Sequence, residues 1–235
     1  MNVKLSIIIP CYNEENTLRQ IVQEVLKQLD LIKEIIIVDD NSSDSSKKII
    51  EELAKENSTI KYIFKDFNEG KGSAIIKGIS IATGDIILIQ DADLEYSPDN
   101  YSILLKPIID NHADVVYGSR FMGPGPNRAL YFWNRIGNKV VTTLCNICNN
   151  LTLTDMETCY KVFRKEFVSK VSLEENKFGI EPELTIKFAK QGARIYEVGI
   201  DYYGRQINEG KKITWKDGIA AIYHILKYSF FKEIK

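Results

Sequence analysis

Short, continuous apolar runs alternate along the first half of this chain with longer segments whose apolar residues recur at helical spacing. A continuous apolar run is typical of a strand that is buried on both faces. Predominantly apolar segments of this kind, some with a polar residue inside or at an end, occur at residues 5–9, 34–40, 60–64, 85–90 and 113–117. Helical spacing is found at residues 17–29, 45–57, 74–82 and 101–109. This alternation predicts a mostly parallel sheet covered by helices on both faces, which is a three-layer α/β fold.

The second half of the chain breaks the alternation. Residues 129–153 mix aromatic and aliphatic side chains with basic ones, and residues 154–164 have the pattern of an acidic loop that enters a strand. The remaining predicted segments are a helix at 178–191, a strand at 194–200, a basic loop at 203–212 and a final helix at 215–231. With 235 residues and neither a repeat nor a linker, we expect a single domain.

Three acidic residues follow the fourth apolar run at alternate positions, namely Asp91, Asp93 and Glu95. In extended chain they would project to one side, and open α/β sheets bind ligands at the carboxyl ends of their strands. Clustered carboxylates repel one another unless a positive group joins them, and a divalent cation that prefers oxygen ligands meets this need. Alternatively, the acids cap the helix near Pro98, although Ser97 is better suited to do so.

Two other strand ends and one loop carry polar residues that would meet at the same edge of a parallel sheet. The first strand is followed by Glu14, and the second ends in Asp39 and Asp40. Lys71 lies between two glycines just before a helix, where free backbone N–H groups would bind an anion. The alternative for this loop is a tight turn with a solvated lysine. Together with later arginines, these residues suit a metal-bound diphosphate.

Composition limits the partners and the compartment. The net charge of −1 provides no basic field for nucleic acid. Four cysteines lack the spacing of a disulfide framework, and only two histidines accompany the lone Cys145–Cys148 pair, which argues against zinc. The amino-terminal residues run straight into a strand pattern without a signal peptide, so we expect a cytoplasmic protein with reduced thiols.

Three other classes of protein deserve comparison. Phosphatases of the haloacid-dehalogenase type carry Asp-x-Asp after their first strand, with Thr or Val next, whereas here the pair follows the fourth strand and precedes Leu94. A nicotinamide dehydrogenase needs a G-x-G-x-x-G turn after the first strand, and residues 10–13 contain no glycine. A non-catalytic nucleotide-binding module would leave the charges of the second half unexplained.

Several short motifs are distributed along nearly the whole chain. They are SIIIPCYNE at 6–14, VDDNSSD at 38–44, GKG at 70–72, QDAD at 90–93 and GSR at 118–120. Together they resemble the family 2 glycosyltransferases with the GT-A fold. TDMETCYKVF at 154–163 and YGR at 203–205 look like the branch that contains dolichyl-phosphate and polyprenyl-phosphate mannose and glucose synthases. The resemblance implies a nucleotide-binding half at 1–120 and an acceptor-binding half at 121–235 that ends in an amphipathic helix.

The resemblance also implies roles for individual residues. Those that would line the nucleotide pocket or read its base are Pro10, Tyr12, Glu14, Asp39 and Asp40. Asp91 and Asp93 would hold Mg2+ or Mn2+ on the diphosphate, and Glu95 stands near them where this branch often carries Gln. Lys71 would lie near the donor. The residues that would bind donor or acceptor phosphates are Arg120, Arg128, Arg205, Lys211 and Lys212.

The implied reaction is inverting transfer of a sugar from a nucleotide donor, GDP-mannose first or UDP-glucose second, to a polyprenyl phosphate. The metal on Asp93, together with Arg205, would stabilise the departing diphosphate. An acceptor phosphate is already ionised and needs no base, whereas a saccharide hydroxyl, as in cell-envelope polysaccharide synthesis, would need one. The candidate bases are Asp155, then Glu181 and Glu183. A metal-dependent phosphohydrolase is the remaining alternative.

A polyprenyl acceptor lies in the bilayer, so we expect peripheral contact with the cytoplasmic face of the membrane. No segment supplies the roughly 20 apolar residues of a spanning helix. Residues 129–144 and 219–231 combine aromatic residues with basic ones and fit interfacial helices. A helix with one face in the protein core has a similar pattern and is the more common case.

Overall fold

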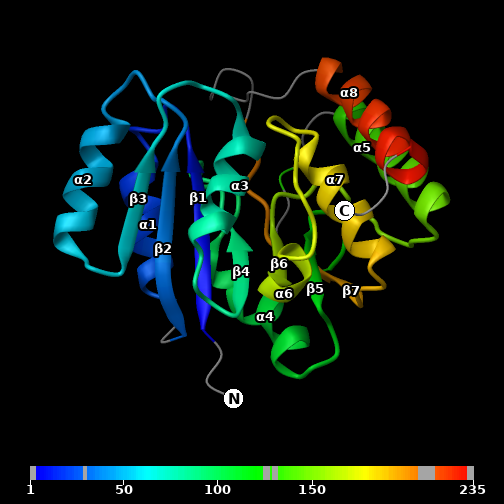
Figure 1. The fold of residues 1–235 in the computed structure, drawn as a ribbon, viewed down its shortest axis with the longest axis horizontal. Coiled ribbons are helices and arrows are strands. Elements are labelled where there is room, and N and C mark those ends of the chain that lie inside the picture. The colour runs from blue at the N-terminus through cyan, green and yellow to red at the C-terminus, as the bar shows by residue number, and fades with distance from the viewer. Residues whose placement is uncertain (1–3, 29–30, 124–127, 129–131, 206–214, 232–235) are drawn as a thin grey trace.

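A computed structural model describes residues 4–28, 31–123, 128, 132–205 and 215–231 of the chain (Figure 1). Seven strands form one sheet in the order β3-β2-β1-β4-β6-β5-β7. Their bounds are β1 Leu5–Cys11, β2 Ile32–Asp39, β3 Ile60–Phe64, β4 Ile86–Ile89, β5 Val115–Ser119, β6 Lys161–Arg164 and β7 Ile195–Gly199. The neighbouring strands are parallel except where β6 pairs with β4 and β5.

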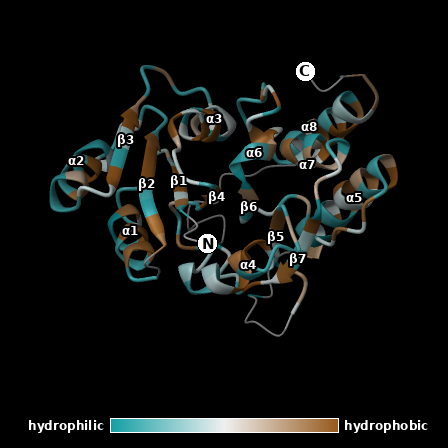
Figure 2. Ribbon diagram, turned by 60° about the horizontal axis from the view of Figure 1, so that its bottom comes forward, coloured by the Kyte–Doolittle hydropathy of each residue, from teal (hydrophilic) through white to brown (hydrophobic). Residues whose placement is uncertain are grey.

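Helices cover both faces of the sheet. They are α1 Leu18–Leu26, α2 Ser46–Glu56, α3 Lys71–Ile81, α4 Tyr101–Ile109, α5 Phe132–Asn149, α6 Lys165–Val168, α7 Ile180–Lys190 and α8 Trp215–Leu226, with a 3-10 turn at Pro98–Asn100 and a π-helical turn at Lys227–Phe231. Figure 2 shows α1 and α4 on one side of the sheet and α3 and α7 on the other. The predicted three-layer, mostly parallel α/β fold is confirmed.

The hydrophobic core consists of two clusters, one on each face, because successive side chains of a strand point to opposite sides. In β1, Ile7 and Ile9 pack in the cluster that includes α1, α2 and α4. Ile8 between them packs in the cluster that includes α3, α5, α7 and α8. Burial on both faces is why the strand sequences are continuous apolar runs rather than alternating ones.

Helix α3 begins at Lys71, three residues earlier than predicted, and the two glycines beside it have a packing role. Gly70 has φ +110°, and a Cβ on Gly72 would lie 2.1 Å from the carbonyl oxygen of Glu175. The N–H of Ser73 donates to the Asn176 carbonyl at 2.9 Å. The glycines therefore allow a close backbone approach by the chain's own segment at 175–177.

The acidic stretch after β4 is a turn and not extended chain. Strand β4 ends at Ile89, and Leu94 has φ +64°, which turns the backbone back on itself. The expectation that the three acids project to one side of an extended strand is therefore wrong. The turn nevertheless keeps all three side chains at the carboxyl end of β4, and Ser97 accepts from the Asp99 N–H to cap the turn that follows, as predicted.

Candidate functional site

Arg205 joins two of the three acids that follow β4. Its Nη2 lies 2.6 Å from Asp93 Oδ2, and its Nε lies 3.4 Å from Glu95 Oε1. The backbone N–H of Arg205 also donates to Glu95 Oε1 at 2.8 Å, and Tyr202 donates its hydroxyl to Glu95 Oε2. Glu14, from the turn after β1, lies 3.6 Å from Nη1 of the same guanidinium. The structure thus brings Arg205 onto the acids that the sequence assigns to a metal.

Lys71 pairs with the third acid, Asp91. Its Nζ lies 2.6 Å from Asp91 Oδ1 and donates to Cys159 Sγ at 2.8 Å. Burial would raise the pKa of Asp91, but Lys71, Cys159 and Arg205 together hold that pKa below its ordinary value. Burial likewise opposes the charge of Lys71, yet Asp91, Cys159 and Glu181 raise the pKa of Lys71 well above its ordinary value. The lysine is therefore not solvated and remains a cation within the site.

Negative charge exceeds positive charge in this cluster. Burial, together with the neighbouring Asp91 and Glu95 carboxylates, raises the pKa of Asp93 to about 7 even though Arg205 lies against it. Within the described ranges no three acidic, His or Cys side chains already converge on one point. Carboxylate oxygens are nevertheless the ligands that Mg2+ and Mn2+ prefer, and an excess of buried negative charge favours a divalent cation. The residues present fit such an ion.

Asp155 is held in an ion pair and does not stand free as a base. Arg120 donates to it from its backbone N–H at 3.0 Å and from Nε and Nη2 at 2.7 Å, and Asn138 of α5 donates at 3.0 Å. Burial would raise the pKa of Asp155, but Arg120 holds it below its ordinary value. This pairing argues against the predicted role of Asp155 in proton transfer and that of Arg120 in phosphate binding.

The ends of β1 and β2 meet where the sequence predicts a nucleotide pocket. The Asp40 N–H donates to the Cys11 carbonyl at 2.8 Å, which ties the two turns together. Asp40 is committed to Lys65 and to the backbone of Gly70. Asp39 accepts from the Ser42 N–H through Oδ2, while its buried Oδ1 lacks a partner among the described residues. Asp39 is therefore better suited than Asp40 to contact a base.

The remaining predicted residues that the structure describes lie around this edge. Tyr12 is 39% exposed beside the β1 end, and Pro10 is part of β1, paired with Val38. Arg128 donates through Nη1 to the Gly204 carbonyl at 3.0 Å, next to Arg205. Lys211 and Lys212 lie outside the described residues.

Sequence reasoning missed three residues that the structure adds to the site. Lys161 is fully buried, and its Nζ pairs with Glu181 Oε2 at 2.6 Å. Cys159 contacts Lys71, and Glu157 has a buried Oε1 without a hydrogen bond in the part of the chain described. Burial and the nearby Glu181 carboxylate raise the pKa of Glu157 to about 7. All three follow Asp155 within six residues, so the motif itself was the available signal.

An open, mostly parallel α/β sheet with carboxylates, a lysine and an arginine at its carboxyl edge belongs to the class of α/β proteins that bind their ligands at that edge. Comparison with known sequences makes the assignment specific. The profile described as glycosyl transferase family 2 matches residues 6–172, and the chain belongs to this family. The resemblance inferred from the motifs is thereby confirmed.

Two curated relatives match most of this chain. The dolichol-phosphate mannosyltransferase of Pyrococcus furiosus is 29% identical over 231 residues, which cover 96% of this chain and 64% of the relative. The undecaprenyl-phosphate 4-deoxy-4-formamido-L-arabinose transferase of Proteus mirabilis is 29% identical over 212 residues, covering 88% of this chain and 62% of the relative. This chain therefore spans less than two thirds of the length of either protein.

Solved structures share the fold. Glucosyl-3-phosphoglycerate synthase of Mycobacterium tuberculosis, solved with Mn2+, UDP and phosphoglyceric acid, has a TM-score of 0.74 at 18% identity. The match covers 98% of this chain and 80% of that one. The same synthase has also been solved with Mg2+ and UDP. These likenesses establish the GT-A fold that the motifs predict.

Proposed function

We propose that this chain transfers a sugar from a nucleoside diphosphate to a polyprenyl phosphate, with GDP-mannose as the first candidate donor and UDP-glucose as the second. The observation that carries the proposal is the excess of carboxylates at the end of β4 in a chain of this family. The names of the two relatives support a polyprenyl-phosphate acceptor. Residues 1–120 would bind the nucleotide, and residues 121–235 would bind the acceptor.

Asp91, Asp93 and Glu95 would hold the divalent cation. The ion, when bound, supplies positive charge to the oxygens of the leaving diphosphate. Mn2+ and Mg2+ accompany UDP in the synthase of similar fold, which supports either ion here. Lys71 and Arg205 lie against the same acids, so both would bind the donor phosphates from the protein side.

Two of the three predicted bases, Asp155 and Glu183, are engaged by other groups, which favours an acceptor that is already ionised. Asp155 is enclosed by Arg120 and Asn138. Glu183 accepts from the backbone N–H groups of Glu174 and Glu175 and pairs with Lys187 at 2.6 Å. A phosphate acceptor needs no proton removed, whereas a sugar hydroxyl does. Phosphate is therefore the better match to these engaged carboxylates.

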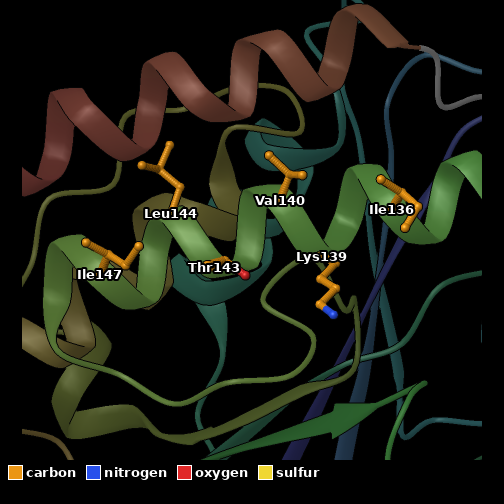
Figure 3. Close-up of a pocket in the computed structure, with 6 residues that line it drawn as sticks. All are labelled: Ile136, Lys139, Val140, Thr143, Leu144 and Ile147. Carbon is orange, nitrogen blue, oxygen red and sulfur yellow. The ribbon is translucent and has the colours of Figure 1, made fainter.

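An apolar face on α5 and α8 supports a lipid acceptor. Helix α5 buries only Val141, Thr142 and Cys145. A hollow on its outer side is lined by Ile136, Lys139, Val140, Thr143, Leu144 and Ile147, and Figure 3 shows them along this one helix with α8 running beside it. The interpretation of these segments as ordinary core helices is therefore incomplete. Exposed contiguous apolar side chains fit the interfacial region of a membrane.

Two exposed aromatic side chains lie outside the hollow, one in α5 and one at the end of the segment that follows α8. Trp133 at the start of α5 is 77% exposed, and Phe231 at the end of the π-helical turn is 82% exposed. No described helix is long and apolar enough to cross a membrane. We propose peripheral binding at the cytoplasmic face, with this surface against the lipid.

The first test is transfer of labelled sugar from a donor panel into short polyprenyl phosphate, in detergent with Mg2+ or Mn2+. We expect organic-phase label from one donor, its loss with chelator, and its loss in Asp93→Asn. Retained transfer by Asp93→Asn in chelator would refute the metal assignment. Metal-dependent nucleotide binding without organic-phase label would instead favour a saccharide hydroxyl, and Glu157 would then be the base to test.

The lipid-facing surface has its own test. We expect Trp133→Ser with Phe231→Ser to reduce co-sedimentation with anionic vesicles several-fold. Phe67→Ser is the matched control, because Phe67 is 75% exposed but follows β3 in the other half of the chain. Equal sedimentation of all three proteins would exclude the apolar face as the membrane contact.

A further inference from the structure

Glu181 carries a buried carboxylate oxygen without a hydrogen-bond donor. The residue is 2% exposed and lies in the first turn of α7. Its Oε2 pairs with Lys161, whereas its Oε1 has no hydrogen-bond partner in the described part of the chain. A buried acceptor left unsatisfied is costly, and one beside a functional site needs an explanation.

Lys71 stands between this oxygen and the acid cluster. Its Nζ is 2.6 Å from Asp91 Oδ1 but 3.8 Å from Glu181 Oε1, which is beyond hydrogen-bond range. Its other close contact, Cys159 Sγ at 2.8 Å, is a weak acceptor. The Lys71 ammonium therefore hydrogen-bonds to Asp91, which is predicted to bind the divalent cation, and not to Glu181.

We propose that the Lys71 ammonium moves its hydrogen bond from Asp91 to Glu181 when a divalent cation binds Asp91. By accepting the ammonium, Glu181 leaves the Asp91 oxygen to the cation. This inference rests on the proposed function, because it requires a cation at Asp91. An ammonium and a divalent cation on one carboxylate repel each other strongly in a buried site. A shift of about 1 Å brings Nζ into hydrogen-bond range of Glu181 Oε1 and satisfies the oxygen that lacks a donor.

Glu181 suits this role because its carboxylate is fixed. The Lys161 ammonium that holds Oε2 is itself anchored by the carbonyl oxygens of Met156 and Thr158. Lys71, by contrast, is a flexible stem with a compact charge, which can change partners without moving the backbone. Glu181 is thus a positioning residue, which acts on the cation site through Lys71.

The direct test is a crystal structure of the wild-type protein with Mn2+ and a nucleoside diphosphate. We expect Mn2+ on Asp91 and Lys71 Nζ within hydrogen-bond range of Glu181 Oε1. Mn2+ on Asp91 with Lys71 still bonded to that acid would overturn this inference alone. Mn2+ absent from Asp91 would overturn both this inference and the metal assignment in the proposed function.

A double-mutant cycle provides a second, solution test through Mn2+ affinity, measured by paramagnetic resonance of the free ion. Glu181→Gln should weaken Mn2+ binding roughly ten-fold, since a hydrogen bond between charged groups is lost. In a Lys71→Met background the same substitution should have no effect. Equal weakening in both backgrounds would contradict the exchange. Glu34→Gln is the control, and this substitution should leave Mn2+ affinity unchanged. Glu34 is a buried carboxylate in β2 that pairs with Lys61 of β3.

Discussion

Replacing Arg205 with Met should make the protein bind Mn2+ more tightly in the absence of nucleotide. The guanidinium lies 2.6 Å from Asp93 Oδ2, and a cation that takes this oxygen must first break that bond. A hydrogen bond between charged groups contributes roughly 1.5–3 kcal/mol. Because both side chains are partly exposed, we take the lower end of this range. About 1.4 kcal/mol corresponds to a factor of ten, so we expect an affinity gain of about ten-fold.

The measurement is a Mn2+ titration without nucleotide, followed by paramagnetic resonance, at pH 8. This pH matters because Arg205 lowers the pKa of Asp93, and its removal would leave that carboxyl partly protonated nearer pH 7. Arg19→Met is the control, since Arg19 pairs with Glu52 and Glu56 between α1 and α2. Folded Arg205→Met that binds Mn2+ no more tightly than wild type at pH 8 would refute the reasoning.

Three further outcomes follow from the same geometry. Because the pKa of Asp93 is raised to about 7, its carboxyl group is mostly neutral below that pH. Mn2+ affinity should therefore fall by up to ten-fold for each pH unit below 7 and level off above it. A Mn2+ affinity that does not change with pH would contradict this. Asp93→Asn should not lower Tm at pH 8, because a raised pKa means that the ionised carboxylate destabilises the fold there; a clear loss of Tm would count against it. Asp155→Asn should reduce the free energy of unfolding in urea by about 3 kcal/mol, since it leaves the largely buried Arg120 without its ionised partner; unchanged stability would show that the pair is not structural.

The strands of the first half could be predicted because strands that are buried on both faces consist mostly of apolar residues. The orientation of β6 could not, because the pairs Ile87 with Phe163 and Val116 with Val162 join segments far apart in the chain. The start of α3 was misjudged for a related reason. Gly70 and Gly72 are required by contact with residues 175–177, which no local pattern reveals.

The site was predicted in part. The position of the acids after β4 follows from the chain order, but their partners do not. Asp155 looked like an available base because its pairing with Arg120 spans 35 positions and depends on tertiary packing. The same holds for Arg205, which the motif assigns to phosphate and which this structure pairs with Asp93. Residue types indicate which charges are present, whereas only the fold shows which of them neutralise each other.

The antiparallel strand β6 has a consequence for how the protein folds while it is being synthesised. It lies between β4 and β5, so these two strands of the first half do not pair with each other and are joined in the sheet only through residues 161–164. During synthesis, β4 would wait with an open edge while more than 40 further residues after β5 emerge. The acids at the end of β4 would gain their cationic partner Arg205 later still. A ribosome-bound chain ending near residue 120 should therefore be open to proteases.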